Sequence, residues 1–244
     1  MKSQLCVNKK TASCMVYGEL GRFKIEVNVQ KRMIGFWLKI VKSKLSKLSN
    51  VFYRLLRNMY EANEYKSSWI HKIKTILDSC GMSNVWEHPN DFNHSWILNS
   101  VELKLKDMER QNLHAEVERN VLCRNYKIFK TDFGREIYIT ELDTSDRIAL
   151  SKYRCGSHKL PVAIERYARQ ENHHPCRMCD TNELGDEYHY LLVCPTIREI
   201  RERYLPSYFC RTPSIIKFSQ LLSVTNNKKL KNLAKFVNQI LSLF

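Results

Sequence analysis

Residues His173 to Pro195 read HHPCRMCDTNELGDEYHYLLVCP. This stretch contains four metal-binding residue types in the spacing C-x2-C-x9-H-x4-C, at Cys176, Cys179, His189 and Cys194. A C-x2-C turn supplies two thiolates from one bend of the backbone, and Zn²⁺ binds four such ligands as a tetrahedron. With all four ligands from the protein, no coordination position remains for water. The spacing therefore predicts one structural Zn²⁺ and not a catalytic one.

The residues around the ligands favour a short helix with His189 in its first turn. Leu184-Gly185-Asp186 is a turn signal, and Asp186 can cap that helix. Pro195 disfavours helical backbone at Cys194 and favours a new helix after it. We therefore expect the fourth ligand at a junction between two helices.

Two alternatives to this ligand set remain open. Cysteine is commonly buried, so the four residues could be unlinked side chains of a core helix and its loop. His173 and His174 directly precede the C-x2-C turn, and either could replace a ligand. The pair Cys155-x2-His158 resembles half of a second site, but no second half lies at a sensible spacing. We therefore expect one metal site.

The composition is that of a globular chain with a strong positive charge. Hydrophobic residues make up 43% and charged residues 27% of the 244 residues, which is ordinary for a folded protein. The 40 Lys and Arg against 25 Asp and Glu give a formal net charge of +15. This excess favours a polyanionic partner, nucleic acid first and an acidic membrane surface second. A basic but inert surface remains the alternative.

The cysteines and the apolar runs bear on the compartment. Nine cysteines are spread along the chain without the rhythm of a disulfide framework, and the opening MKSQLCVNKK has no apolar signal-peptide segment. No apolar run approaches the roughly 18 residues that span a bilayer. We therefore expect a soluble protein without a membrane partner, in a reducing intracellular compartment, either the nucleus or the cytoplasm.

Apolar residues recur at spacings of three and four along most of the chain, which predicts a mainly α-helical fold. Gly81 is the expected C-terminal cap of the third helix, and Thr144 or Ser145 can cap a later one. The first four main helices are expected from Glu26 to about Leu45, over Phe52–Met59, from about Ser67 to Cys80, and from Leu98 to about Arg119.

We expect the chain to divide into three segments. A basic, bundle-like helical region covers 1–125, a small zinc-binding helical module covers 126–205, and an amphipathic helical tail covers 206–244. The stretch 126–139, YKIFKTDFGREIYI, is rich in aromatic and β-branched residues around a turn signal, which predicts a short β-hairpin.

The cations of the first helical region are candidates for phosphate contacts, because the main acidic residues among them are Glu61 and Glu64. Aromatic residues lie between them and could stack on bases or else pack in the core; they are Trp37, Tyr53, Tyr60 and Tyr65. The predicted nucleic-acid-binding residues are Lys31, Arg32, Lys39, Lys42, Arg54, Arg57, Lys72, Lys74, Arg198 and Arg201.

Motifs of catalysis are missing from the sequence. There is no G-x-x-x-x-G-K-[ST] loop, no G-x-S-x-G elbow and no H-E-x-x-H helix. The aromatic-x-Asp-Asp pair of two-metal polymerases is also missing. Asp143 and Asp146 are close in sequence, but Asp146 lies where a helix cap is expected. We therefore expect no autonomous enzyme activity.

Short motifs follow one another in a characteristic order from about Lys9 to about Tyr204. The earlier ones are Cys14-Met-Val-Tyr-Gly-Glu-Leu-Gly-Arg-Phe, Phe36-Trp-Leu-Lys-Ile, Trp69-Ile70 with Ile76-Leu-Asp-Ser-Cys-Gly, and Tyr126-Lys-Ile-Phe-Lys-Thr-Asp-Phe-Gly. The later ones are Leu150-Ser-Lys-Tyr-Arg-Cys-Gly-Ser-His-Lys-Leu-Pro, the C-x2-C turn, Gly185-Asp-Glu-Tyr-His-Tyr and Cys194-Pro. In this order the chain resembles the region downstream of the polymerase in animal non-LTR (LINE-like) retrotransposon reverse transcriptases.

The resemblance implies that the zinc-binding quartet of this family falls on Cys176, Cys179, His189 and Cys194. It also implies a C-terminal fragment or a free-standing remnant that holds template RNA or target DNA near an enzyme supplied elsewhere. The polymerase and endonuclease that precede this region in the family are not found in the sequence, so reverse transcription is not implied. The stretch after Cys194 also lacks the acidic and lysine pattern of a restriction-like endonuclease.

Two other interpretations remain. The chain could be a structural or protein-interaction module without nucleic-acid affinity of its own, which docks on a polymerase-bearing polypeptide through the amphipathic tail after Lys217. It could also be a degenerate reading frame that folds poorly and has no activity.

Overall fold

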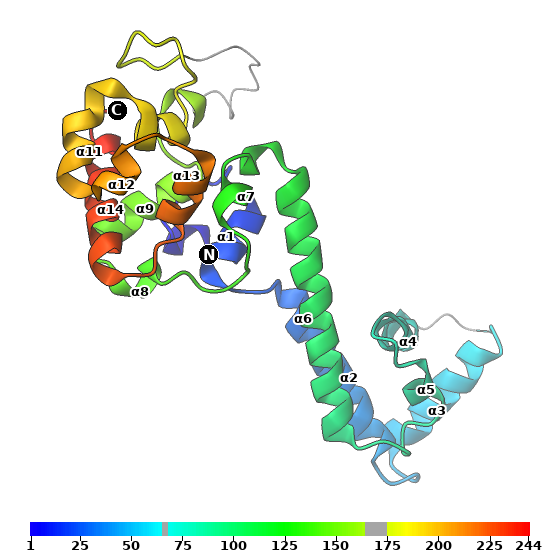
Figure 1. Ribbon diagram of the computed structural model, residues 1–244. Helices are drawn as coiled ribbons and strands as arrows, with labels where there is room; N and C mark the ends of the chain where they lie inside the picture. The colour runs from blue at the N-terminus through cyan, green and yellow to red at the C-terminus, as the bar shows by residue number, and fades with distance from the viewer. Residues whose placement is uncertain (65–67, 164–174) are drawn as a thin grey trace. The chain divides into compact units, whose positions relative to one another are not determined.

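The computed structural model describes residues 1–64, 68–163 and 175–244, and the chain forms two compact units (Figure 1). Unit 1 comprises Met1–Arg22 with Leu113–Phe244, and unit 2 comprises Phe23–Asn112. The described residues contain no β-sheet, only an isolated bridge between Pro175 and Leu184. The mainly α prediction is confirmed. The division differs from the three predicted segments, because the boundaries at 125 and 205 both fall inside unit 1.

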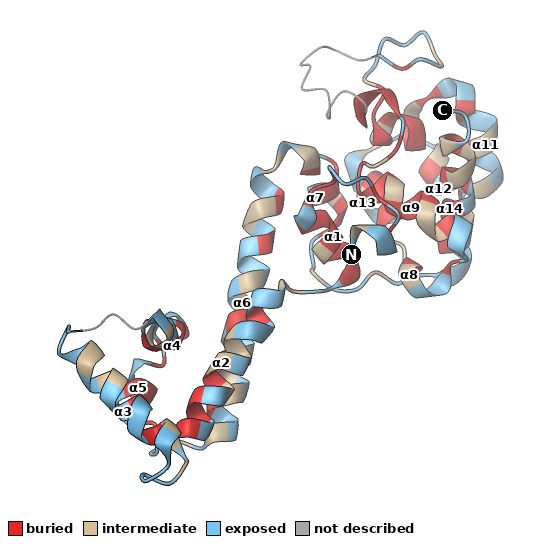
Figure 2. Cartoon of the chain, turned by 180° about the vertical axis from the view of Figure 1, so that it is seen from behind, coloured by how far each residue is buried: buried red, intermediate tan, exposed pale blue. Residues whose placement is uncertain are grey.

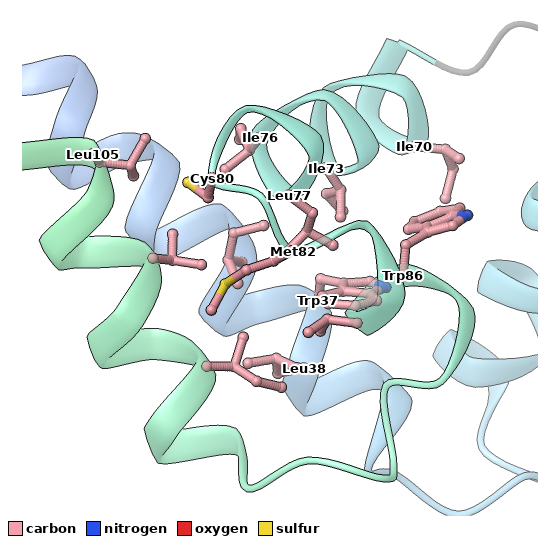
Figure 3. Packing of buried hydrophobic residues seen from close by; sticks show 14 of the residues in the cluster. Trp37, Leu38, Ile70, Ile73, Ile76, Leu77, Cys80, Met82, Trp86 and Leu105 are labelled. Atoms are coloured by element: carbon pink, nitrogen blue, oxygen red, sulfur yellow. The ribbon is translucent and has the colours of Figure 1, made fainter. Parts of the chain in front are cut away.

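Unit 2 is a small helical bundle with one core. Its apolar faces meet around Trp37 and Trp86, whose rings stack with centroids 5.9 Å apart. Figure 3 shows Leu38, Ile73 and Leu77 gathered around the same pair. The predicted spacing of apolar residues is therefore the spacing that builds this core. The helices are α2 (Ile25–Val41), α3 (Leu48–Glu61), α4 (Ser68–Ser79), α5 (Ser83–Glu87) and the first part of α6 (His94–Arg119).

Side chains and glycine set the ends of these helices. Gly81 caps α4 as predicted, with φ +70°. The first helix ends at Val41 and not near Leu45, because the Asn50 amide donates to the carbonyls of Ile40 and Ser43 at 3.0 Å each. At the other end of unit 2, the Asn93 side chain accepts from two backbone N–H groups at 2.9 and 3.1 Å, so α6 begins one turn earlier than predicted.

Unit 1 is assembled from the two ends of the described chain. α14 packs along α9, and its apolar residues are buried (Figure 2). The segment 206–244 is therefore part of the unit 1 core, in contrast to the predicted separate tail. The cap of α9 is Asp143, whose carboxylate accepts from the N–H of Asp146 at 3.0 Å, and not Thr144 or Ser145. The main helices are α1 (Ser13–Leu20), α7 (Tyr126–Phe129), α8 (Tyr138–Glu141), α9 (Thr144–Arg154), α11 (Arg198–Tyr204), α12 (Ser207–Cys210), α13 (Ile215–Leu222) and α14 (Asn227–Leu241).

The stretch 126–139 does not form the predicted β-hairpin. It contains α7, a loop and the start of α8. Tyr126 and Phe129 lie three residues apart, so one helical turn directs both side chains into the core. There Phe129 meets the ring of Phe218 in α13 at a centroid distance of 6.1 Å. Aromatic enrichment in this stretch therefore reflects core packing and not strand pairing.

The loop after α7 is held against the end of α1 at Gly21. This glycine has φ +59°, a left-handed conformation. A Cβ at this position would lie 2.2 Å from the backbone nitrogen of Arg135. Backbone conformation and the close approach of the loop both require glycine here.

A buried ionic network ties the helices of unit 1 together. Arg154, at the end of α9, donates to both carboxylate oxygens of Glu19 in α1 at 2.8 and 2.9 Å. The same guanidinium lies 3.1 Å from Glu136 and donates to the carbonyl oxygen of Leu222 in α13. Tyr138 in α8 also donates to Glu19, at 2.6 Å. Four helices meet at this ion pair.

Removing the arginine should destabilise unit 1 strongly. We expect Arg154→Met to lower the free energy of unfolding by about 3–5 kcal/mol, because the Glu19 carboxylate stays buried without its guanidinium partner. Lys152→Met, on the same helix but only half-buried, should change it by less than about 0.5 kcal/mol. Urea denaturation followed by circular dichroism measures both variants, and equal effects would contradict the assignment.

Candidate functional site

The four predicted ligands lie together in unit 1. The Sγ atoms of Cys176, Cys179 and Cys194 and a ring nitrogen of His189 all lie within 4.8 Å of one another. Cys176 Sγ is 3.8 Å from Cys194 Sγ, and Cys179 Sγ is 3.4 Å from His189 Nε2. Among the described residues, this is the group of Cys, His and acidic side chains that could hold a metal ion. The predicted ligand set is thus brought together by the fold.

Local backbone structure positions each ligand. The N–H of Met178 points at Cys176 Sγ at 3.4 Å, which fixes the C-x2-C turn. The Asp186 carboxylate accepts from the N–H of His189 at 2.9 Å and is the predicted cap. His189 begins a π-helical turn, η3 (His189–Val193), which ends where the N–H of Cys194 donates to the His189 carbonyl at 2.8 Å. Pro195 then starts η4 (Pro195–Ile197), so the fourth ligand lies at a junction, as expected.

Residues outside the quartet orient the ligands. His189 Nδ1 lies 2.9 Å from a carboxylate oxygen of Glu183, which leaves Nε2 facing the thiols. Such a carboxylate partner fixes the orientation of a ligating imidazole and raises its basicity. The Cys176 N–H donates to the Glu183 carbonyl at 2.8 Å, so one residue supports two ligands. The sequence offered no signal for this role beyond an acidic residue near the predicted turn.

The surroundings shift the pKa values of Cys179 and Cys194 in opposite directions. Burial disfavours the Cys179 thiolate, but hydrogen bonds with Thr181, Cys176 and His189 outweigh it and lower the pKa of Cys179 to about 6. Burial, together with the neighbouring Cys176, raises the pKa of Cys194 to about 11. Cysteine binds metal as the thiolate. A cation bound among these thiols would therefore release at least the proton of Cys194 at neutral pH.

The alternative ligands do not all fall within the described residues. His173 and His174 lie outside them. His158 is buried and lies 3.0 Å from a carboxylate oxygen of Glu187 through Nε2, while its Nδ1 accepts from the N–H of Leu160 at 3.3 Å. Its two nitrogens are thus occupied within the protein, and the Cys155-x2-His158 half-motif is no metal site in this structure.

Arg201 is buried and holds the backbone next to two of the ligands. Its Nε donates to the carbonyl of Leu191 at 2.8 Å, and its Nη2 donates to the carbonyl of Cys194 at 2.9 Å. These bonds satisfy carbonyls at the end of η3 that the helix leaves unpaired. Arg201 is therefore not available to a phosphate, contrary to the sequence prediction.

Four predicted cations line one groove in unit 2. The groove runs along α2, has a volume of about 640 Å³, and includes His94 from the start of α6. Lys31 is paired with Glu102, whereas the other three cations are exposed. A helix rises about 1.5 Å per residue, so the cations extend over about 16 Å of α2. The four are Lys31, Arg32, Lys39 and Lys42.

The remaining predicted cations do not gather at that groove. Arg54 and Lys72 are exposed on α3 and α4. Arg57, Lys74 and Arg198 each pair with a carboxylate four residues further along the same helix, at 2.7, 3.3 and 2.8 Å. Intrahelical pairs of this kind are weak and leave Lys74 and Arg198 available to another anion. Arg57 is held more firmly, because it also lies 3.4 Å from Glu87 and over the ring of Trp86.

The predicted stacking aromatics are mostly packing residues. Trp37 and Tyr53 are buried in the unit 2 core, and Tyr60 lies 3.1 Å through its OH from His71 Nδ1. Tyr65 lies outside the described residues. The aromatic side chain in the groove is instead Phe36, which is 58% exposed. Its ring meets the edge of Trp69 at a centroid distance of 6.1 Å, and the rest of the ring is open to the groove.

The ligand set can be tested by metal analysis. Protein purified under reducing conditions should contain one metal ion per chain, and Cys179→Ser should lose it. Because metal binding energy is folding energy in such sites, backbone amides from Tyr188 to Val193 should also lose protection from hydrogen exchange. Cys6→Ser, at an exposed thiol, should keep the metal. Metal retained at full occupancy by Cys179→Ser would show that the ligand set is wrong.

No described helix is long and apolar enough to cross a membrane. No family model, curated protein or solved structure matches the chain.

Proposed function

We propose that the quartet of Cys176, Cys179, His189 and Cys194 holds one structural Zn²⁺. Zinc–sulfur and zinc–nitrogen bonds of about 2.3 and 2.0 Å give a tetrahedron with S–S edges of about 3.8 Å and S–N edges of about 3.5 Å. The distances of 3.8 Å between sulfurs and 3.4 Å between sulfur and nitrogen agree with such edges. Thiolate ligands persist in a reducing compartment, which favours the nucleus or the cytoplasm.

We further propose that the zinc-stabilised chain binds nucleic acid and does not catalyse a reaction. The observation that carries this proposal is the groove along α2, because exposed cations on one face of one helix can neutralise successive phosphates. Phe36, exposed within the same groove, offers a base a surface to stack on. The formal net charge of +15 supports the same partner.

The order of sequence motifs supports a more specific proposal. It favours the C-terminal, zinc-binding region of a non-LTR retrotransposon reverse transcriptase, one that holds RNA or DNA for a polymerase supplied elsewhere. In that role the metal quartet would keep unit 1 folded, while unit 2 would provide the contacts with phosphates.

Charge reversal in the groove tests nucleic-acid binding. We expect Lys39→Glu/Lys42→Glu to weaken binding and to make the slope of log K against log salt shallower by roughly 1.4 for single strands, because two phosphate contacts are lost. Filter binding of single-stranded RNA, single-stranded DNA and duplex over a salt series measures the slope and shows which nucleic acid is preferred.

The matched control carries the same charge change in unit 1. Lys231→Glu/Lys235→Glu reverses two exposed lysines on α14 and should leave the slope nearly unchanged. Equal effects of the two variants would exclude the groove as the binding surface. Binding of the unchanged protein that did not vary with salt would exclude phosphate contacts altogether.

A second candidate function, docking on a protein, is favoured by the exposed apolar stripe of α3. Leu48, Val51, Phe52 and Leu55 are 69%, 47%, 54% and 53% exposed. Their spacing of three and four places them on one face of the helix, while the buried Tyr53 lies on the other. The tail after Lys217, predicted as the docking surface, buries its apolar residues in unit 1 and is not available.

Charge identifies the partner that this stripe would fit. Lys44, Lys47 and Arg54 are exposed beside the stripe, and the sequence from 42 to 60 contains no acidic residue. Two copies of this face would repel each other, whereas an acidic amphipathic helix would match both the apolar side chains and the cations. We therefore propose an acidic helix of a polymerase-bearing polypeptide as the occupant.

A defined peptide tests the stripe. A synthetic helical peptide with leucines at spacings of three and four, flanked by glutamates, should bind the protein, and Phe52→Ser should weaken binding at least about tenfold, or about 1.4 kcal/mol. Leu103→Ser, at an equally exposed apolar residue of α6, is the control and should bind as before. Fluorescence anisotropy gives both constants. Equal binding to a lysine-flanked peptide would argue against an acidic partner.

A further inference from the structure

Two buried thiols of unit 1 face each other across a long separation in sequence. Cys14 Sγ in α1 lies 3.6 Å from Cys123 Sγ in η2 (Val121–Cys123), and the two residues are 109 positions apart. Both side chains are fully buried. The sulfurs of a disulfide lie about 2.05 Å apart, so these need to approach by about 1.5 Å. The pair is in contact but reduced.

The pair lies where the chain leaves unit 1 and where it returns. Cys14 precedes Arg22, the last residue of the N-terminal part of unit 1, and Cys123 follows Leu113, the first residue of the second part. All of unit 2 therefore lies between the two cysteines in sequence. A bond between them would join the two segments of unit 1 covalently and close one loop that contains all of unit 2.

The two thiols differ in acidity, which suits a nucleophile and its resolving partner. The hydrogen bond with Cys123 lowers the pKa of Cys14, against opposing effects of burial and of Glu116. The same hydrogen bond, together with burial and the charges of Glu116 and Cys155, raises the pKa of Cys123. Of the two thiols, Cys14 therefore ionises more readily, and Cys123 is the one that retains its proton.

We propose that Cys14 and Cys123 are a redox-active pair that closes to a reversible disulfide on exposure to a peroxide. The Cys14 thiolate attacks one oxygen of hydrogen peroxide, the O–O bond breaks, and hydroxide leaves and takes a proton, which gives a sulfenic acid and water. The Cys123 sulfur then attacks the Cys14 sulfur, the S–S bond forms and the S–O bond of the sulfenic acid breaks. Its OH group leaves as a second water with the Cys123 proton. Two electrons pass from the thiols to the peroxide.

Burial of the two thiols limits the rate of this reaction. The peroxide reaches the pair through local opening of unit 1, so the reaction is slower than modification of the exposed Cys6. Once formed, the disulfide restricts the unfolded chain over a loop of about 109 residues, which favours the folded state. Oxidised protein should therefore unfold at a higher urea concentration than reduced protein.

Peptide mapping tests the pair directly in the metal-loaded chain of 244 residues. After treatment with hydrogen peroxide and alkylation of free thiols, trypsin should release a cross-linked pair of peptides, Thr11–Arg22 and Asn120–Arg124. A thiol reductant should separate them. The urea midpoint should rise on oxidation and return on reduction. Reading the peptides by mass keeps this result distinct from oxidation of the metal ligands.

Matched variants decide the assignment. Cys123→Ser should abolish both the cross-linked peptide and the rise in midpoint, whereas Cys80→Ser, at a buried cysteine of unit 2, should keep both. The proposal would be overturned if Cys14 and Cys123 were alkylated as free thiols after a treatment that fully oxidises Cys6. A cross-link from Cys14 to any other cysteine, or an equal midpoint shift in Cys123→Ser, would also overturn it.

Discussion

Unit 1 depends on the buried ion pair between the guanidinium of Arg154 and the carboxylate of Glu19. Desolvating a charged pair is costly, and the cost is offset here because almost every donor of Arg154 meets an acceptor, from Glu19, Glu136 and the Leu222 carbonyl. These acceptors come from three segments that lie far apart in the sequence. An apolar core alone would tolerate sliding of α9 against α1, whereas a bidentate pair permits one register. The position of α13 follows from that register through the Leu222 carbonyl, and α14 packs along α9 itself.

The metal quartet illustrates how a weakly apolar segment is given structure. Residues 175–186 contain little that could form a core, and their ligands are held by short local contacts, such as the Glu183 carbonyl on the N–H of Cys176. Of the second pair of ligands, His189 begins η3 and Cys194 directly follows it, and the η3 residues Tyr190 to Leu192 are buried in unit 1. A metal ion would thus attach a loop with few packing contacts to a helix with many. Arg201 completes the arrangement by satisfying carbonyls that the irregular turn leaves open.

The helices and the candidate metal ligands could both be predicted from the sequence, for the same reason. Both depend on spacing within a few residues, as in the apolar positions of α2 or the C-x2-C turn with the Asp186 cap. What the sequence could not provide depends on contacts between different elements, whether these lie near or far apart in the chain. The stretch 126–139 has strand-like composition but packs on α13 and α1, and Arg201 looks like a surface cation but meets the carbonyl of Cys194. The end of α2 at Val41 was missed because Asn50, a residue of the next helix, determines it.

The insertion of unit 2 into unit 1 bears on the order of folding during synthesis. Unit 2 is one continuous segment, so all of its core has left the ribosome once residue 112 has emerged. Glu19 emerges much earlier but waits 135 further residues for Arg154. Throughout that interval α1 is an isolated helix of eight residues, too short to persist in water. We therefore expect unit 2 to form before unit 1, which is the reverse of the order in which their first residues are made.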